Sequence, residues 1–462
     1  MFKSILNTLS NCFKIPELKS RIIFTMIVLG ICRLASLVPA PGLNSALLKN
    51  YFASNAGRNA TNGLLGMYSL FTGGGFERCA IGALGIMPYI SATIILQLLQ
   101  AVIPGLSKLA REEGGRTKLI QYGRVLTLFL CLGQGFVMAI GWERMSDVFP
   151  GFSGQLVLFT NHIWLYRIQT AVILTTGTML LMWLGEQITD RGIGNGISLI
   201  ITIGILARLP QAGQGLVDMF LSHGVSDAHR YNIFHFIALI LLLCAVIAGV
   251  VAVTQAERKI PVQYAQRVVG RKMYSGGSSF MPLRVNYSGV MPVIFASAIL
   301  MFPTMILNFL GSHFEIKVFI ELATQLTRGS PLYLLLYGLM ILFFSYFWVA
   351  TQFNELQIAD DMKKSGGYIP GVRPGQATSN FLHRTMSRIT LAGAIFLTVI
   401  AVIPIILSDA MTVPQQVSQF FGGTSLLIMV GVMLDTMRQM EAHLLMRHYD
   451  GFLKKGRLKG RF

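Results

Sequence analysis

Long apolar segments alternate with short polar and basic stretches along most of the 462-residue chain. Most of these segments approach the length of about 20 residues that a helix needs to cross a bilayer. The pattern predicts an all-α polytopic membrane protein with ten transmembrane helices. The ten apolar segments are 22–38, 79–103, 124–142, 165–185, 193–209, 233–254, 289–310, 332–351, 389–408 and 423–441.

A short apolar stub and three glycines precede the second of these segments. Residues 64–71 give about two helical turns, too few to cross a membrane, and residues 73–75 are all glycine, which disfavours continued helix. Segment 79–103 itself contains two glycines and Pro88. Together these features predict a helix that dips into the membrane and turns back. Non-helical backbone at that depth is tolerated only where protein or a water-filled cavity surrounds it, so the stretch predicts a cavity or pore.

Lys and Arg exceed Asp and Glu by 38 to 20, which gives a formal net charge of +18. Such an excess is typical either of nucleic-acid binding or of a basic membrane face. With the N-terminus placed in the cytoplasm, most Lys and Arg fall in the loops on that side, which is the usual bias of cytoplasmic loops. Both termini are therefore predicted to be cytoplasmic, and this orientation explains most of the charge without nucleic acid.

Ten spans divide into five and five, and because five is odd the second half begins on the opposite side from the first. If the halves are structural repeats, they are inverted about an axis in the membrane plane. The second half carries two large cytoplasmic loops, at about 255–288 and 352–388. The expected parts are an interfacial segment 1–21, a first half 22–209 with the stub at about 65–75, an external connection 210–232, a second half 233–441 and a basic tail 442–462.

Charge is absent from the middles of the ten segments, which argues against ion-coupled transport, because coupling requires a buried titrating or ion-binding group. Near span ends we expect charged side chains to snorkel to the interface. The charged residues so placed are Arg33, Arg167, Glu186 and Asp435. Residues 192–196 only faintly resemble a phosphate loop and are expected to form a tight connection between two spans.

Catalytic motifs and metal-ligand spacings are also absent from the sequence. The five scattered cysteines are interpreted as small buried hydrophobic residues, with neither a disulfide nor a metal site. We expect no enzymatic activity and no cofactor.

The two cytoplasmic loops mix turn residues, apolar anchors and basic groups. In the first loop, residues 283–286 alternate as in a β-strand, and the second loop carries Arg373 among prolines and glycines. An ordered docking surface and a basic loop that faces anionic lipid explain this composition about equally well.

At these residues the chain closely resembles the SecY/Sec61α family, and its bacterial members in particular. The match extends over nearly the whole chain and rests on long shared strings, which are more specific than short patterns. The strings lie at 83–92, 182–189, 191–198, 257–267, 366–375 and 421–428. The sequence departs from the family at Gln266, where lysine is frequent, and after Asn354, where a proline is frequent.

The resemblance implies two inverted five-helix halves around a central hourglass pore, with a hydrophobic ring, an external plug helix and a lateral gate. The implied ring is Ile86, Ile90, Ile197, Ile201, Ile294 and Ile428. The implied plug is Leu65, Met67, Tyr68, Leu70 and Phe71 with a hinge at Gly73, Gly74 and Gly75, and the implied gate positions are Ser91 and Phe302. The six isoleucines lie near the middles of the predicted segments. Without the resemblance, an isoleucine in a membrane helix would more often face lipid or a neighbouring helix.

The function that the resemblance implies is a pore-forming subunit of a protein-conducting channel in the bacterial inner membrane. Such a channel passes unfolded secretory proteins and releases apolar segments sideways into lipid. The implied partners are SecE and SecG subunits, the motor ATPase SecA, the ribosome through contacts to rRNA, signal peptides and nascent polypeptides, membrane lipids and a YidC-type insertase. The implied docking positions are Arg267, Arg271, Lys272 and Arg373. The alternative is a secondary transporter of a small solute.

Overall fold

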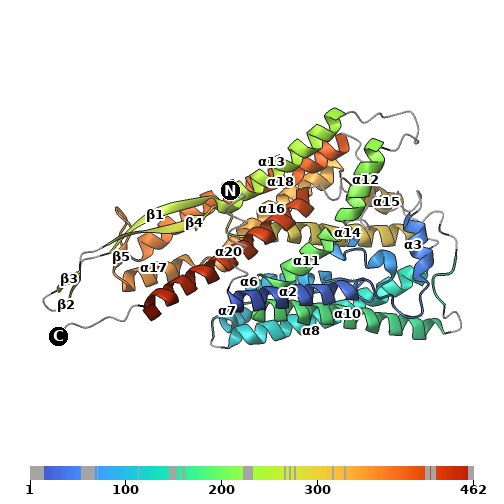
Figure 1. The fold of residues 1–462 in the computed structure, drawn as a ribbon, viewed down its shortest axis with the longest axis horizontal. Coiled ribbons are helices and arrows are strands. Elements are labelled where there is room, and N and C mark those ends of the chain that lie inside the picture. The colour runs from blue at the N-terminus through green and yellow to red at the C-terminus, as the bar shows by residue number, and fades with distance from the viewer. Residues whose placement is uncertain are drawn as a thin grey trace. The chain divides into compact units, whose positions relative to one another are not determined.

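Helices occupy all ten of the predicted apolar segments in the computed structural model (Figure 1). These helices are α2 (Pro16–Ala35), α6 (Met87–Val102), α8 (Gly115–Glu143), α10 (Ile163–Arg191), α11 (Gly196–Leu206), α13 (Ile233–Gln255), α14 (Met291–Phe314), α16 (Pro331–Gln352), α18 (Gln376–Ala410) and α20 (Gly423–Lys455). The structure describes residues 15–53, 68–69, 71–112, 114–143, 145, 152, 154–158, 162–221, 233–264, 267–269, 272–274, 277–314, 317–326, 329–410, 417 and 423–455.

Shorter elements join the long helices. The helical ones are α3 (Ser45–Ala53), η1 (Phe76–Arg78), α7 (Pro104–Arg111), α12 (Leu209–Leu221), α15 (Lys317–Gln325) and α17 (Glu355–Lys364). The strands are β1 (Glu257–Tyr264), β2 (Arg267–Val269), β3 (Lys272–Tyr274), β4 (Ser278–Arg284) and β5 (Gly367–Tyr368). The strand expected at 283–286 is therefore β4, which begins earlier and ends at Arg284.

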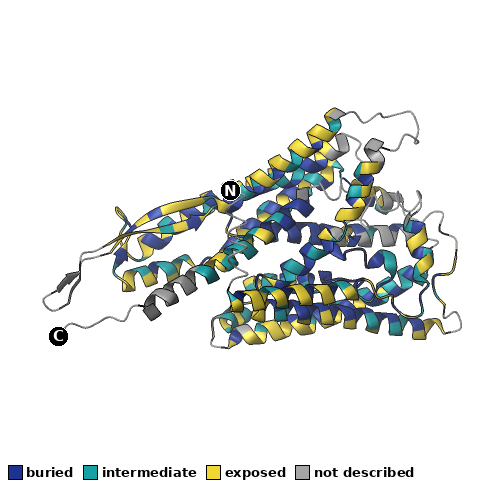
Figure 2. Ribbon diagram, in the orientation of Figure 1, coloured by how far each residue is buried: buried dark blue, intermediate teal, exposed yellow. Residues whose placement is uncertain are grey.

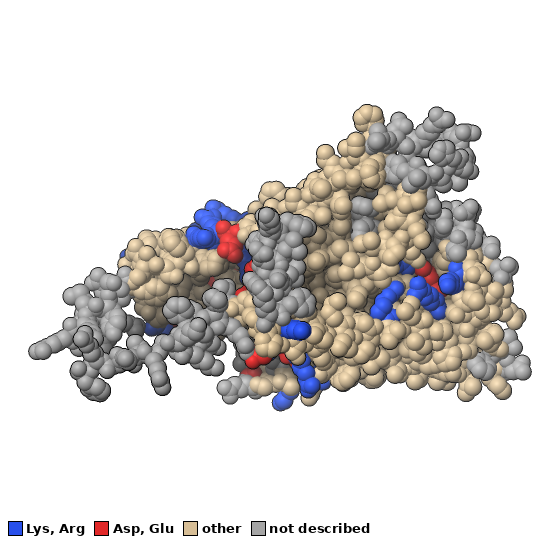
Figure 3. Space-filling model, in the orientation of Figure 1, with Lys and Arg blue, Asp and Glu red and all other residues tan. Residues whose placement is uncertain are grey.

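Six helices in the described ranges are long and apolar enough to cross a membrane, and α6 with α7 gives a seventh if this pair, bent by 107°, is one span. Helix α2 is more strongly charged, because it carries Glu17, Lys19 and both Arg21 and Arg33. Large apolar side chains on these helices are exposed, as expected where lipid replaces water as the solvent (Figure 2). Figure 3 shows wide uncharged areas with the charged side chains gathered in a few groups. The chain is a multi-pass membrane protein.

The chain forms two compact units. The first comprises residues 1–224, 414–420 and 432–462, and the second comprises residues 225–413 and 421–431. Helix α20 therefore contributes its first turns to the second unit and the rest of its length to the first.

Small residues allow the helices of the first unit to pack closely. A Cβ atom added to Gly135 of α8 would lie 3.2 Å from the backbone of Ala171 in α10, and one added to Gly177 would lie 2.3 Å from the carbonyl oxygen of Ile81. Such close backbone approach is typical of helix packing in membranes.

A tight connection joins α10 to α11, as the sequence predicted. The side chain of Asn195 caps α11 by accepting hydrogen bonds from the backbone N–H groups of Ile197 and Ser198, at 3.1 and 3.3 Å. Gly194 has a positive φ of 90°, and its N–H donates to Oε1 of Gln439 at 2.8 Å. The connection is thereby fixed to α20.

In the second unit, the two large loops predicted at about 255–288 and 352–388 fold together. Strand β1 pairs antiparallel with β4 and with β5, so that the sheet has the order β4–β1–β5. This sheet shares a hydrophobic core with the ends of two long helices. The buried core residues are Ile260, Leu283, Val349, Phe353, Ile369, Leu382, Met386 and Ile389. The described residues of both loops therefore form regular structure around one core, which the sequence left undecided.

The start of the second span differs from the prediction. Residues 79–86 form turns, and helix α6 begins only at Met87. A Cβ atom added to Gly82 would lie 3.1 Å from the carbonyl oxygen of Ala35, and Gly85 has a φ of 60°. Pro88 therefore lies in the first turn of α6, where its missing N–H costs nothing, and does not interrupt the helix.

Candidate functional site

The glycine-rich stub lies buried within the first unit. Residues 68, 69 and 71 are helical, turns follow over residues 72–75, and the short helix η1 comes next. Tyr68 and Phe71 are 8% and 7% exposed. The predicted order of stub and glycine turn is thus present among the described residues, whereas Leu65, Met67 and Leu70 of the expected plug lie outside them.

The turn itself depends on two glycines. Gly73 and Gly74 have φ values of +63° and +84°, in the left-handed region that costs an L-residue about 1–2 kcal/mol. The N–H of Gly74 donates to the carbonyl oxygen of Ser69 at 2.9 Å, so the turn closes the end of the helical stub.

Gly204 and Gly85 pack against this turn, and the surface that they form is called the seat. A Cβ added to Gly204 of α11 would lie 3.2 Å from the carbonyl oxygen of Phe71, and one added to Gly73 would lie 3.0 Å from Cα of Gly204. On another side, a Cβ at Gly85 would lie 3.1 Å from Cγ2 of Thr72. The turn is therefore packed backbone against backbone, with no room for larger residues in the seat.

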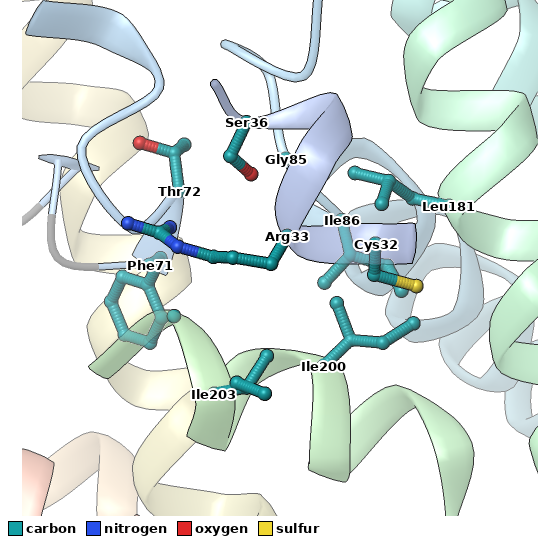
Figure 4. A pocket seen from close by; sticks show the side chains of 11 residues that line it. Cys32, Arg33, Ser36, Phe71, Thr72, Gly85, Ile86, Leu181, Ile200 and Ile203 are labelled. Atoms are coloured by element: carbon teal, nitrogen blue, oxygen red, sulfur yellow. The ribbon is translucent and has the colours of Figure 1, made fainter. Parts of the chain in front are cut away.

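Two arginines hold the turn by polar contacts. Arg33, in the last turn of α2, donates from Nη1 to the carbonyl oxygen of Gly73 at 2.7 Å, and Figure 4 shows its side chain reaching toward Thr72. Arg208, which follows α11, donates from Nη2 to Oε1 of Glu77 at 2.6 Å. Ser69 donates from its hydroxyl to the same carboxylate oxygen at 2.7 Å and also contacts Arg208.

Three of the four charged residues near span ends have partners within the protein, which the snorkelling prediction did not include. Arg33 points into the protein at the glycine turn. Arg167 pairs with Glu143 at 2.8 Å, and Glu186 pairs with Arg124 at 2.7 Å. These partners are 24 to 62 residues away along the chain, so sequence spacing does not show them.

An aromatic cluster that the sequence analysis missed surrounds η1. Phe76 is 5% exposed, and its ring centroid lies 6.1 Å from that of Tyr68, 6.2 Å from that of Trp142 and 6.3 Å from that of Phe52. Aromatic rings at these separations attract one another beyond simple burial of area. The cluster anchors the chain directly after the glycine turn.

The ring isoleucines of the first unit lie at the beginnings of helices. Ile86 is the N-cap of α6, and its carbonyl oxygen accepts a hydrogen bond from the N–H of Ile90 at 3.1 Å. Ile197 and Ile201 occupy the first turns of α11. Ile86, Ile90 and Ile201 are buried, whereas Ile197 is half-buried. Helices α6 and α11 begin later than the predicted apolar segments, so Ile86, Ile90 and Ile197 lie close to helix starts and Ile201 lies at the middle of α11.

A small cavity adjoins Ile86 (Figure 4). Its volume is about 20 Å³, enough for one water molecule, and it lies between α2, the glycine turn and α11. The α11 residues that line it are Ile200, Ile203 and Gly204, and neither Ile197 nor Ile201 is among them.

The two ring positions of the second unit also lie near helix starts. Ile294 in α14 is 1% exposed, and Ile428 in α20 is fully buried at 0%. Their helices meet closely, because a Cβ added to Gly431 would lie 2.2 Å from Cγ1 of Val290.

The expected gate positions lie in α6 and α14. Ser91 is buried, and its hydroxyl donates to the carbonyl oxygen of Met87 at 3.0 Å. This bond satisfies the hydroxyl within its own helix. Phe302 belongs to α14, but its side chain lies outside the described part of the structure.

The expected docking residues lie in the two large loops of the second unit. Arg267 begins β2 and Lys272 begins β3, which pair as a short antiparallel hairpin, while Arg271 lies outside the described residues. Arg373 is exposed, and its carbonyl oxygen accepts a hydrogen bond from the hydroxyl of Thr378 at 2.9 Å.

The two departures from the family pattern fall near these loops. Asn354 caps α17 by accepting a hydrogen bond from the N–H of Gln357 at 3.2 Å, so the helix begins cleanly without a following proline. Gln266 lies outside the described residues.

Buried cysteines fit the interpretation as small hydrophobic residues at three positions, Cys32, Cys79 and Cys131. Cys244 differs, because it lies exposed on α13, and Cys12 lies outside the described residues. Within the described ranges, no group of three or more His, Cys, Asp or Glu side chains could hold a metal ion.

Comparison with known proteins decides the family. Residues 80–437 match the SecY family. The chain belongs to the SecY family. It is 45% identical over 459 residues to protein translocase subunit SecY of Chlamydia trachomatis, covering 98% of this chain and 99% of that protein. It is 42% identical over 448 residues to protein translocase subunit SecY of Escherichia coli K12, covering 96% of both.

Solved structures share the fold of this SecY-family chain at lower identity. A structure described as a protein conducting channel has a TM-score of 0.59 at 18% identity, covering 91% of both chains. Sec61 in the canine ribosome-channel complex has a TM-score of 0.52 at 18% identity, also covering 91% of both chains. The ten-helix, all-α membrane fold predicted from the sequence is confirmed.

Proposed function

We propose that this chain is the central pore-forming subunit of a Sec protein-conducting channel. It passes unfolded secretory proteins across the membrane and releases apolar segments sideways into lipid. The observation that carries the proposal is 45% identity over nearly the full length to a chain named protein translocase subunit SecY. This role is non-catalytic, so the energy for transport comes from a partner or from the membrane potential.

The glycine turn and its seat suggest how the resting channel is sealed. In the proposal, residues 65–75 form the plug, and Gly73, Gly74 and Gly75 form its hinge. The six isoleucines at 86, 90, 197, 201, 294 and 428 form a ring that opposes ion passage by dewetting. Aliphatic side chains can part around a moving polypeptide without sequence-specific contacts, as a channel for many substrates requires.

Sideways release requires a seam between helices. We assign this lateral gate to spans two and three on one side and seven and eight on the other, with Ser91 on α6 and Phe302 on α14. An apolar signal-peptide segment that reaches the seam gains free energy by leaving water for lipid.

The cytoplasmic loops supply the surface for partners. Arg373 is exposed just after β5, and Arg267 and Lys272 begin the two strands of the β2–β3 hairpin. We propose that these residues, together with Arg271, form the docking surface. We propose that this surface binds the motor ATPase SecA or the ribosome, whose RNA attracts basic groups. A related structure is of Sec61 in a ribosome-channel complex.

The remaining assignments follow from the proposed role. The complex also contains SecE and SecG subunits and exchanges substrates with a YidC-type insertase. The protein lies in the bacterial inner membrane with both termini in the cytoplasm, and its halves, at 22–209 and 233–441, are inverted around an hourglass pore.

Reconstitution tests the proposed function. The chain, copurified with its native small subunits, is placed in liposomes with SecA, ATP and a radiolabelled preprotein. We expect the preprotein to become protected from external protease in an ATP-dependent way. Absence of protection, together with uptake of a small solute by the chain alone, would instead support the secondary-transporter alternative.

A further inference from the structure

We propose that Glu77 and Arg208 form a polar latch with Ser69 that holds the glycine turn in its seat. This inference rests on the proposed plug function and adds the residues that keep the plug closed. All three residues belong to the first unit and lie in described parts of the chain.

The latch joins the two sides of the hinge. Ser69 precedes the left-handed glycines at 73 and 74, and Glu77 follows them. The hydroxyl of Ser69 donates to Oε1 of Glu77 at 2.7 Å, so a hydrogen bond closes the segment across the turn. Residues before the turn cannot move away from η1 until this bond breaks.

Arg208 fastens that closed segment to α11. Its Nη2 donates to Oε1 of Glu77 at 2.6 Å and contacts Oγ of Ser69. The two charged side chains are only 15% and 16% exposed, so water competes weakly for them. Nε of Arg208 is also buried without a partner among the described residues, so loss of the carboxylate would leave this cation poorly satisfied.

The side of the hinge that would stay in place is anchored separately. Phe76 is buried among the rings of Phe52, Tyr68 and Trp142. Glu77 directly follows Phe76, so its position is fixed by the aromatic cluster. Ser69 can form or break its hydrogen bond to Glu77 while Glu77 stays in place. Of these residues Tyr68 lies on the moving side, so its ring would leave Phe76 when the latch opens.

The sequence gives no hint of the latch. Glu77 and Arg208 are 131 residues apart, and Arg208 stands alone at the end of an apolar segment. Both residues act as positioning residues, because they hold the plug and are not assigned contact with the translocating polypeptide.

The test measures ion leakage through the resting channel in liposomes that contain the purified full-length complex. The variants are Glu77→Gln, Arg208→Gln and the two combined, and the control is Arg78→Gln, which removes a neighbouring charge for which no bond to the turn is observed. We expect each latch variant to leak about tenfold more than the parent protein, which a charged hydrogen bond of ordinary strength accounts for. The double variant should leak no more than the leakier single variant, because both substitutions break one contact.

A second readout separates the latch from a general defect. With a preprotein trapped in the pore the plug is already displaced, so the parent protein and all variants should conduct equally. Unchanged resting leakage in Glu77→Gln and Arg208→Gln, or leakage that multiplies in the double variant, would overturn the latch. Deletion of residues 65–71 is the reference: if it too leaves leakage unchanged, the plug assignment itself fails.

Discussion

The glycine turn allows a matched comparison of two neighbouring substitutions, Gly73→Ala and Gly74→Ala. Both glycines have a positive φ, so alanine at either position carries the same backbone strain of about 1–2 kcal/mol in the seated turn. In the proposed opening, residues 65–75 leave the seat that Gly204 and Gly85 form, and the turn is then free to change conformation and relieve this strain. Both variants should therefore leak more ions at rest than the parent protein.

The two positions differ in what the added methyl group meets. At Gly73 it would lie 2.5 Å from Nη1 of Arg33 and 3.0 Å from Cα of Gly204, whereas at Gly74 the nearest atom is Nη2 of Arg208 at 3.5 Å. Gly73→Ala therefore displaces Arg33 and breaks its hydrogen bond to the turn, a loss of about 1.5–3 kcal/mol. This difference corresponds to a further increase in the open population of roughly tenfold or more.

The assay is anion efflux from liposomes that contain the purified complex, without preprotein. Thermal unfolding of both variants in detergent provides the control that each one is folded. We expect Gly73→Ala to leak at least about tenfold more than Gly74→Ala. If the two folded variants leak equally, the close contacts of Gly73 with Arg33 and Gly204 do not help to keep the channel closed.

Three further predictions concern packing and docking. Gly431→Ala should lower the free energy of unfolding by about 1–3 kcal/mol through its clash with Val290, and thermal unfolding should show partial recovery when Val290→Ala is added. Phe76→Ala should cost about 3–5 kcal/mol and increase resting leakage, whereas Phe129→Ala on an exposed face should leave leakage unchanged. Arg373→Glu should slow SecA-driven export severalfold at unchanged thermal stability, and normal export kinetics would remove this residue from the docking surface.

Hydropathy was sufficient to locate the helices but not their ends. Helix α18 begins at Gln376, well before the apolar segment at 389–408, because its polar first turns pack on the β4–β1–β5 sheet through Leu382. Helix α6 begins late, because Gly82 and Gly85 fold the chain into turns against its neighbours. Mean hydropathy reports how apolar the side chains of a segment are, and it contains no information on these backbone contacts.

The site was predictable only in part. The stub and its glycines carry a local signal, because glycine favours the left-handed turn that Gly73 and Gly74 adopt. The polar contacts that hold the turn join residues far apart in sequence, as in the bond between Arg33 and Gly73, so no local pattern reports them. The ring and gate positions came from family resemblance alone and stay predictions.

Passage of a polypeptide through the proposed ring is the central claim, and site-specific photocrosslinking tests it most directly. A photoreactive residue is placed at Ile86 or at Ile428, and at Leu241, which is 67% exposed on α13, as the control. A preprotein is then trapped during SecA-driven transport. We predict crosslinks to the preprotein from Ile86 and Ile428 and none from Leu241. Crosslinks from Leu241 with none from the two ring positions would contradict the account.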